Sequence, residues 1–93
     1  MKEQLKQVVI GVAGQLAYSE TFKISDSEKE EMLNPENWEF KGANSSLIIL
    51  NEMKYLFEYN KFFIQIQLTA VNNVITRIDT ITNPNNKITI NVK

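Results

Sequence analysis

The hydrophobic positions near the start of the chain repeat with the period of an α-helix, and the pattern predicts a helix over residues 3–21. The apolar side chains that share one face of it are Leu5, Val8, Val9, Val12, Ala13 and Leu16. Gly11 and Gly14 lie inside this segment, where a glycine costs about 1 kcal/mol relative to alanine. We therefore expect this helix to approach a sheet or a second helix closely.

A second, short helix is predicted to begin between residues 25 and 27. Ser25 with Glu28 matches a capping box, and so does Ser27 with Glu30. Both choices remain open at this point. Asn34-Pro35 ends the helix, because the residue before a proline is pushed out of the helical region.

The middle of the chain is ambiguous. Residues 37–41 alternate as a short strand, which we expect the run Gly42–Ser45 to break. Residues 45–57 fit an amphipathic helix, which is the interpretation we favour. Residues 53–59 also fit a strand with one face formed by Met53, Tyr55, Phe57 and Tyr59, because a continuous apolar run such as 47–50 suits both structures.

The last third of the chain alternates with the period of β-strands. Residues 62–71, 74–82 and 87–92 predict three strands, joined by turns at Asn72-Asn73 and at 83–86. Together these patterns predict one α+β domain over residues 1–93. Its N-terminal helices would pack on a curved antiparallel sheet that ends in a three-stranded meander.

Arg77 and Asp79 lie two apart in the second of these strands and therefore share one face of it. A plain two-residue turn at 72–73 would put both charges on the apolar face. A three-residue loop or a bulge would shift the register by one, so that Val74, Thr76 and Ile78 join the core face and both charges turn outward. We expect the second register, because burying an unpaired charge costs several kcal/mol.

Composition removes several kinds of chemistry. The 93 residues include no Cys and no His, so disulfides, thiol nucleophiles and the commonest general base are absent. The net charge of −1 argues against nucleic acid as a partner. The run 8–13 is too short and too interrupted for an export signal, and no segment approaches the roughly 20 apolar residues of a membrane span. We expect a soluble, cytoplasmic protein with no membrane partner and no cofactor.

Acidic residues gather in one segment. Residues 26–39 hold six of the eleven acidic residues against the single Lys29. Such a segment suits either a solvated helix start or a docking surface for a protein with a basic surface. The residues that we expect to bind such a partner are Asp26, Glu28, Glu30, Glu31, Glu36 and Trp38.

The order of elements resembles the nuclear-transport-factor-2-like superfamily, which includes polyketide-cyclase-like proteins. The local match covers residues 72–88, where Ile78, Asp79, Asn83, Pro84 and Lys87 follow a run common in the closing hairpin of that family. The resemblance implies a cone-shaped sheet and frequent homodimers through the sheet. A related cystatin-like layout, with a helix gripping a curved sheet, fits the same order. Neither layout implies an activity, because such folds host enzymes and non-enzymes alike.

Two classes of function follow. The first is a non-catalytic protein-binding module of the inhibitor, immunity or adaptor type, which acts through the segment 26–39. The second is a small-ligand pocket domain lined by Tyr55, Tyr59, Arg77 and Asp79. In its isomerase-like form Asp79 would be a general base and a tyrosine the oxyanion donor. The residues supply no metal-ligand pattern. We favour the first class and expect no enzyme.

Overall fold

The computed structural model describes residues 2–19, 24–59, 61, 64–83 and 86–91. The chain divides into two units, Met1–Trp38 and Glu39–Lys93. The first is helical and the second is a sheet, which confirms the α+β class. Each unit is described by itself, and the single-domain organisation stays a prediction.

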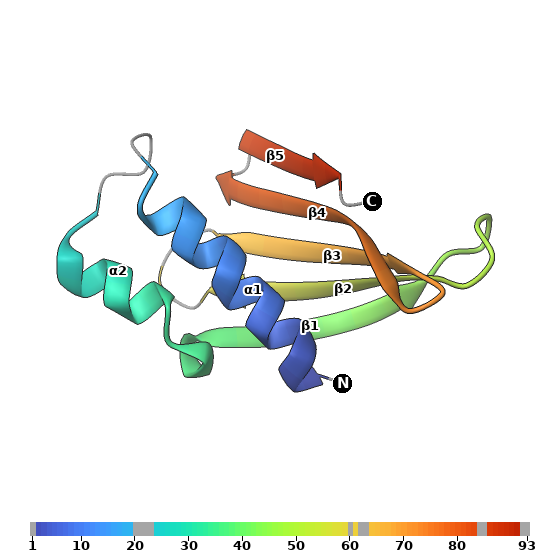
Figure 1. The fold of residues 1–93 in the computed structure, drawn as a ribbon, viewed down its shortest axis with the longest axis horizontal. Helices are drawn as coiled ribbons and strands as arrows, with labels where there is room; N and C mark the ends of the chain where they lie inside the picture. Colours follow the sequence, from blue (N-terminus) through green and yellow to red (C-terminus); the bar gives the residue numbers. More distant parts are fainter. Residues whose placement is uncertain (1, 20–23, 60, 62–63, 84–85, 92–93) are drawn as a thin grey trace. The chain divides into compact units, whose positions relative to one another are not determined.

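The first unit contains α1 (Lys2–Ala17), α2 (Asp26–Met32) and the 3₁₀ helix η1 (Pro35–Asn37) (Figure 1). The predicted helix over 3–21 is confirmed as far as Ala17, and residues 20–21 lie outside the described residues. The α1 side chains with the least exposure recur every fourth position: Leu5, Val9, Ala13 and Ala17. This stripe is narrower than predicted, because Val12 and Leu16 are half-buried at its margin.

Ser25 is the residue that caps α2. Its Oγ accepts from the Glu28 backbone N–H at 3.3 Å, and the Glu28 Oε1 accepts from the Ser25 N–H at 3.1 Å. Of the two predicted capping boxes the first is therefore formed. Asn34 stops α2 as predicted and begins η1, where its Oδ1 accepts from the Glu36 N–H at 3.0 Å.

The two glycines of α1 have different surroundings. A Cβ added at Gly14 would lie 3.2 Å from Cδ2 of Leu33, the residue that ends α2. A Cβ at Gly11 would meet nothing within 4 Å. The expected close approach is confirmed at Gly14 and wrong at Gly11. The end of α2 is tied further by Trp38, whose Nε1–H donates to the Met32 carbonyl at 2.8 Å.

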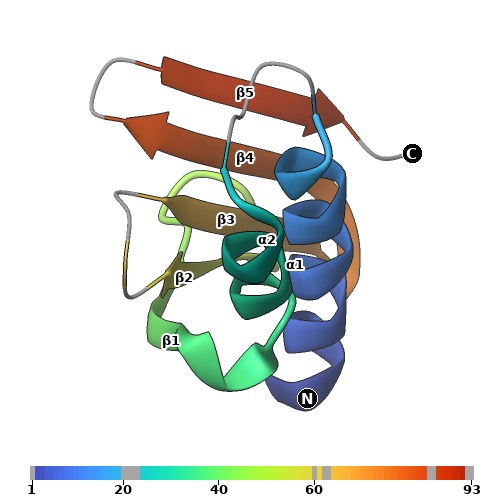
Figure 2. The same ribbon diagram turned by 90° about the vertical axis from the view of Figure 1, so that its left-hand side faces the viewer.

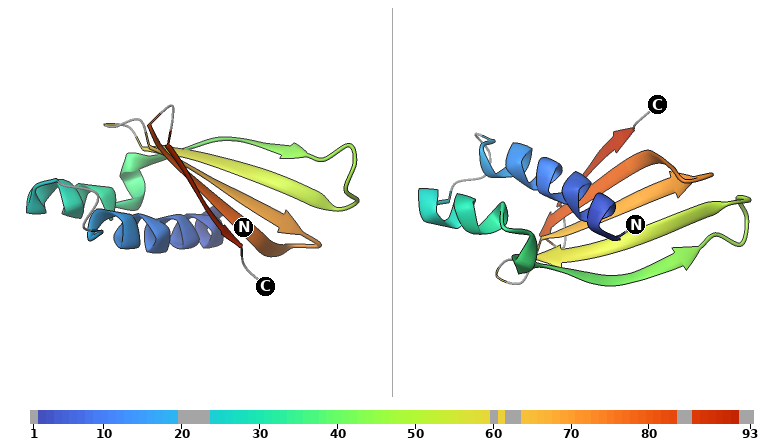
Figure 3. Two further views of the ribbon diagram at one scale, coloured as in Figure 1. Left: turned by 90° about the horizontal axis from the view of Figure 1, so that it is seen from above. Right: turned by 60° about the horizontal axis from the view of Figure 1, so that its bottom comes forward.

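Five strands follow in the order of the sequence. They are β1 (Trp38–Ser45), β2 (Glu52–Tyr59), β3 (Gln65–Val71), β4 (Val74–Asn83) and β5 (Asn86–Asn91). Figure 2 shows them side by side in this order, and Figure 3 shows β1 and β2 running in opposite directions. The pairs β2–β3, β3–β4 and β4–β5 are antiparallel. The predicted meander is confirmed over residues 65–71, 74–83 and 86–91, and β1 and β2 extend it. The predicted strand residues 62–63 and 92 and the turn residues 84–85 lie outside the described residues.

The helix favoured over residues 45–57 is wrong. The chain instead leaves β1 at Ser45, turns through 46–51 and returns as β2. Asn51 adopts a φ of 60° at the end of the turn, which is compatible with a tight reversal and not with a right-handed helix. The second pattern noted for this segment, with Met53, Tyr55, Phe57 and Tyr59 on one strand face, is the one that the structure adopts.

The predicted break at Gly42–Ser45 is also wrong. Strand β1 continues through Gly42, whose φ of 152° is open to glycine and strained for other residues. Glycine usually weakens or ends a strand, but β1 continues through Gly42 to Ser45. Two residues before Gly42, the ring centroid of Phe40 lies 5.2 Å from the ring centroid of Phe57 on β2.

The sheet has one apolar and one more polar face. Residues directly opposite in an antiparallel pair share a face. Tyr55, Leu68 and Ile78 lie opposite one another across β2, β3 and β4, and so do Leu56, Gln67 and Asp79 on the other face. The buried side chains of the apolar face are Phe57, Tyr59, Ile64, Ile66, Leu68, Ala70 and Ile78.

A two-residue turn and a bulge together set the β3–β4 register. Asn72 and Asn73 have φ values of 52° and 66°, as a tight hairpin turn requires. The pairing then shifts between Thr69 and Ala70, so that Arg77 rather than Thr76 lies opposite Thr69. The predicted register shift is confirmed, and Ile78 faces Leu68.

The position of the bulge corrects one detail of that prediction. The bulge comes after Ile75, so Ile75 pairs with Ala70 on the apolar face. Val74 was expected there, but it pairs with Val71 and is exposed. Thr76 occupies the bulge, and its Oγ1 donates to the Thr69 carbonyl at 3.4 Å.

Candidate functional site

Arg77 and Asp79 form an ion pair on the more polar face of the sheet. The Arg77 Nε lies 3.1 Å from Asp79 Oδ2 and 3.2 Å from Oδ1. The Arg77 side chain is 46% exposed, whereas that of Asp79 is 3% exposed. The Arg77 side chain therefore faces outward as predicted, whereas Asp79, which was expected to face outward as well, is buried.

The residues predicted to line a pocket are not brought together. Tyr55 lies opposite Leu68, on the apolar face, and Tyr59 shares that face. Arg77 and Asp79 lie opposite Thr69 and Gln67, on the other face. The sheet separates the proposed base from the proposed donors. Grouping these four residues in one pocket is therefore wrong, because successive strand residues point to opposite faces.

The acidic segment keeps only part of its predicted surface. Lys29 Nζ lies 3.7 Å from Asp26 Oδ1, and Glu28 forms the capping box of α2. Glu30 and Glu36 are exposed, and Glu31 is half-buried. Trp38 is buried, so including it among the exposed partner-binding residues is wrong. Its indole N–H already bonds to a backbone carbonyl at the end of α2.

The most unusual surface of the described residues is the loop between β1 and β2. It carries four consecutive aliphatic residues, Leu47 to Leu50, with exposed fractions between 48% and 101%. We call these four residues the apolar tip. The sequence pattern placed them in a helix or a strand and not in an exposed loop. The signal that could have found them is the lack of alternation in an apolar run bounded by Ser45-Ser46 and Asn51.

Ser46 organises the backbone of the apolar tip. Its Oγ accepts from the backbone N–H groups of Ile48 at 3.1 Å and Ile49 at 3.0 Å. Its own N–H donates to the Glu52 carbonyl at 3.1 Å, and the Glu52 N–H donates to the Ile49 carbonyl at 3.4 Å. The loop is therefore a hydrogen-bonded turn that presents apolar side chains and in which the N–H groups of Ile48 and Ile49 are bonded internally.

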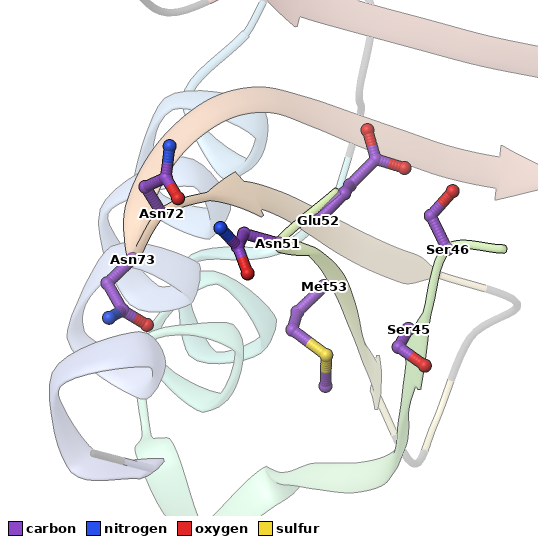
Figure 4. Close-up of a pocket in the computed structure, with 7 residues that line it drawn as sticks. All are labelled: Ser45, Ser46, Asn51, Glu52, Met53, Asn72 and Asn73. Carbon is purple, nitrogen blue, oxygen red and sulfur yellow. The ribbon is translucent and has the colours of Figure 1, made fainter. Parts of the chain in front are cut away.

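A hollow of about 530 Å³ lies beside the apolar tip (Figure 4). Its lining residues are Ser45, Ser46, Asn51, Glu52, Met53, Asn72 and Asn73. The Asn72 N–H donates to the Asn51 carbonyl at 3.0 Å, which ties the β3–β4 turn to the end of the β1–β2 loop. Figure 4 shows the three asparagine side chains grouped at this end of the sheet. We call Asn51, Asn72 and Asn73 the amide rim.

Within the described parts of the chain, no cluster of acidic side chains has the geometry to hold a metal ion. Neither described α-helix has the length and hydropathy needed to cross a bilayer. Comparison of the chain with protein-family models, with curated proteins and with solved structures finds no match.

Proposed function

We propose that this chain is a non-catalytic protein-binding module and that the apolar tip is its main binding element. The observation that supports the proposal is the exposure of Leu47, Ile48 and Leu50, each more than 80% accessible. Burying one such side chain fully is worth about 1.5–3 kcal/mol. A contiguous exposed apolar patch of this kind is typical of an interaction site.

The geometry favours binding of a protein over conversion of a small molecule. An isomerase-like site needs a base and an oxyanion donor that face one cavity, and here Asp79 and the tyrosines lie on opposite faces of the sheet. Small-ligand pockets are mostly apolar. The hollow beside the tip is lined instead by hydroxyls, amides and one carboxylate, with Met53 as its apolar residue.

The acidic segment is a second proposed contact surface of the same module. Its exposed carboxylates are those of Asp26, Glu30, Glu36 and Glu39. Asp26 pairs with Lys29 and Glu39 with Lys41, so we propose that Glu30 and Glu36 meet basic side chains of the partner. Charge pairs at an interface rim act mainly on the association rate, so we assign them less of the affinity than the apolar tip.

A quantitative pull-down from source-cell lysate tests this proposal. Wild type is compared with a tip variant, Leu47→Ser with Ile48→Ser and Leu50→Ser, and with a charge variant, Glu30→Lys with Glu36→Lys. Glu28 is left intact because its side chain completes the capping box of α2. We expect a stoichiometric protein that wild type and the charge variant retain and that the tip variant loses.

Two other outcomes change the proposal. Loss with the charge variant alone moves the main binding surface to the acidic segment. Wild type that is folded and pure but captures no protein overturns the proposal. Far-UV circular dichroism of every variant confirms that each chain is folded before binding is compared.

A further inference from the structure

We infer that the apolar tip inserts into an apolar groove of a partner protein and that the amide rim bonds to uncharged or basic groups along the edge of that groove. This inference rests on the proposed function and specifies the chemistry of the partner. It is argued from the backbone of the tip, from the composition around it and from its charge.

Two backbone N–H groups of the apolar tip keep their hydrogen bonds when the tip leaves water. A backbone N–H that enters an apolar environment without an acceptor costs as much as a lost hydrogen bond. At the tip, the N–H groups of Ile48 and Ile49 already have an acceptor in Ser46 Oγ. Insertion of these residues therefore removes apolar surface from water and leaves those two N–H groups satisfied.

The surroundings of the tip match the layout of a protein interface. Such interfaces have an apolar centre enclosed by a polar, hydrogen-bonding rim. The amide rim lies directly beside the tip, and the bond from Asn72 to Asn51 holds the two hairpin ends together. Each asparagine side chain offers both a donor and an acceptor, as the backbone groups at the edge of a groove require.

Charge argues against a bilayer as the occupant. Between residues 41 and 54 the sequence has three charged residues, Lys41, Glu52 and Lys54, and Glu52 lines the hollow beside the tip. Stable attachment to a membrane takes an apolar element together with a basic patch or a second anchor. Two lysines with the Glu52 carboxylate between them do not form such a patch. The same carboxylate favours a partner whose groove edge is neutral or basic.

Size argues against a second copy docked tip to tip. A stable interface takes roughly 20–30 residues from each side. A symmetric contact between two six-residue loops, each spanning 46–51, supplies far fewer. A groove can enclose the tip on both sides and also reach the amide rim at the end of the β1–β2 loop and on the β3–β4 turn.

Photo-crosslinking in source-cell lysate tests the inference, with benzoylphenylalanine placed in turn at Ile48, at Ser45 and at Lys54. Ser45 lines the hollow, and Lys54 is an exposed control on the polar face of β2. We expect positions 48 and 45 to crosslink one and the same protein, with position 48 mapping to apolar residues of it. Position 54 should not crosslink that protein.

Two substitutions measure the roles of single residues in affinity for the crosslinked protein. Ser46→Ala should weaken binding about tenfold, and Ser46→Thr, which keeps the hydroxyl, should restore it. Asn73→Gly tolerates the positive φ and removes one amide, so a loss of about three- to tenfold is expected. Unchanged affinity in Ser46→Ala and Asn73→Gly overturns the roles assigned to the turn and the rim.

The alternative occupants give different results. Crosslinks to a second copy of the chain overturn the proposal of a partner groove. So does tip-dependent flotation with phosphatidylcholine vesicles, whether or not they contain phosphatidylserine. If the pull-down yields a tip-dependent protein but position 48 maps to its charged surface, the proposed function stands and this inference fails. If the pull-down yields no protein, both fail.

Discussion

Arg77 and Asp79, two residues apart on β4, form an ion pair in which the cation is half-exposed and the carboxylate is almost fully buried. The β-bulge before them turns both side chains away from the apolar face. The Asp79 carboxylate is nevertheless almost fully removed from water. Its interaction with the Arg77 guanidinium is therefore worth more than that of an ordinary surface pair.

Arg77→Ala should lower the free energy of unfolding by about 1–2 kcal/mol. A fully exposed pair is worth less than about 1 kcal/mol, and breaking a fully buried one costs about 3–5 kcal/mol. The half-exposed Arg77 falls between these limits. Urea titration measures the change, with Lys54→Ala on the same face as the control, expected to change stability by less than about 0.5 kcal/mol. Equal losses of stability from the two substitutions would mean that the ion pair of Arg77 with Asp79 does not stabilise the fold.

Ser25→Ala should destabilise the helical unit by about 1 kcal/mol, because it removes the acceptor for the Glu28 N–H at the start of α2. Ser27→Ala is the matched control and should cost less, since Ser27 does not cap the helix. Trp38 is the single tryptophan and bonds to the Met32 carbonyl at the end of α2. Its fluorescence during denaturation therefore reports on this unit. A larger loss at Ser27 would mean that the capping assignment is wrong.

The two glycines of α1 should respond differently to alanine. Gly11→Ala should raise the free energy of unfolding by roughly 0.5–1 kcal/mol, because alanine favours the helix and its Cβ meets nothing within 4 Å. Gly14→Ala should gain less or lose stability, because Cδ2 of Leu33 must move to admit the Cβ. Thermal denaturation of both variants measures the difference. An equal gain at both positions would mean that Leu33 yields without cost.

The apolar tip should contribute little to the stability of the free chain. Ile48→Ala should change the free energy of unfolding by less than about 0.5 kcal/mol, because Ile48 is almost fully exposed. Ile66→Ala deletes the same atoms from a fully buried site on β3 and should cost about 2–5 kcal/mol. Chemical denaturation of the two variants makes the comparison. A cost at Ile48 similar to that at Ile66 would show that the tip is packed in the free chain.

Local sequence signals predicted the parts of the fold that depend on neighbouring residues. The Ser25 capping box, the stop at Pro35 and the Asn72-Asn73 turn each follow from the chemistry of a few adjacent residues. The register shift in β4 could also be anticipated, because the plain two-residue turn would have put Arg77 on the apolar face. The resemblance to the nuclear-transport-factor-2-like superfamily stays a prediction.

The candidate site was harder to predict, because it depends on which residues other parts of the chain cover. An apolar run such as 47–50 is equally compatible with a core helix, a strand and an exposed loop, and its exposure is decided by the reversal at Asn51. Asp79 was expected to face outward because burying an unpaired charge is costly, and Trp38 was expected to bind a partner together with the acidic residues of 26–39. Both are buried. Neither chemical type reveals the packing around it.

The sequential order of the five strands has a consequence for how the sheet forms. Each strand pairs with the one before it across a connection of two to six residues, so every strand pair closes a short loop. The entropy lost on closing such loops is small, and short sequence separations between contacts favour rapid folding. The sheet can therefore assemble by successive addition of strands from any of its hairpins, and we expect it to fold faster than a Greek-key sheet of equal size.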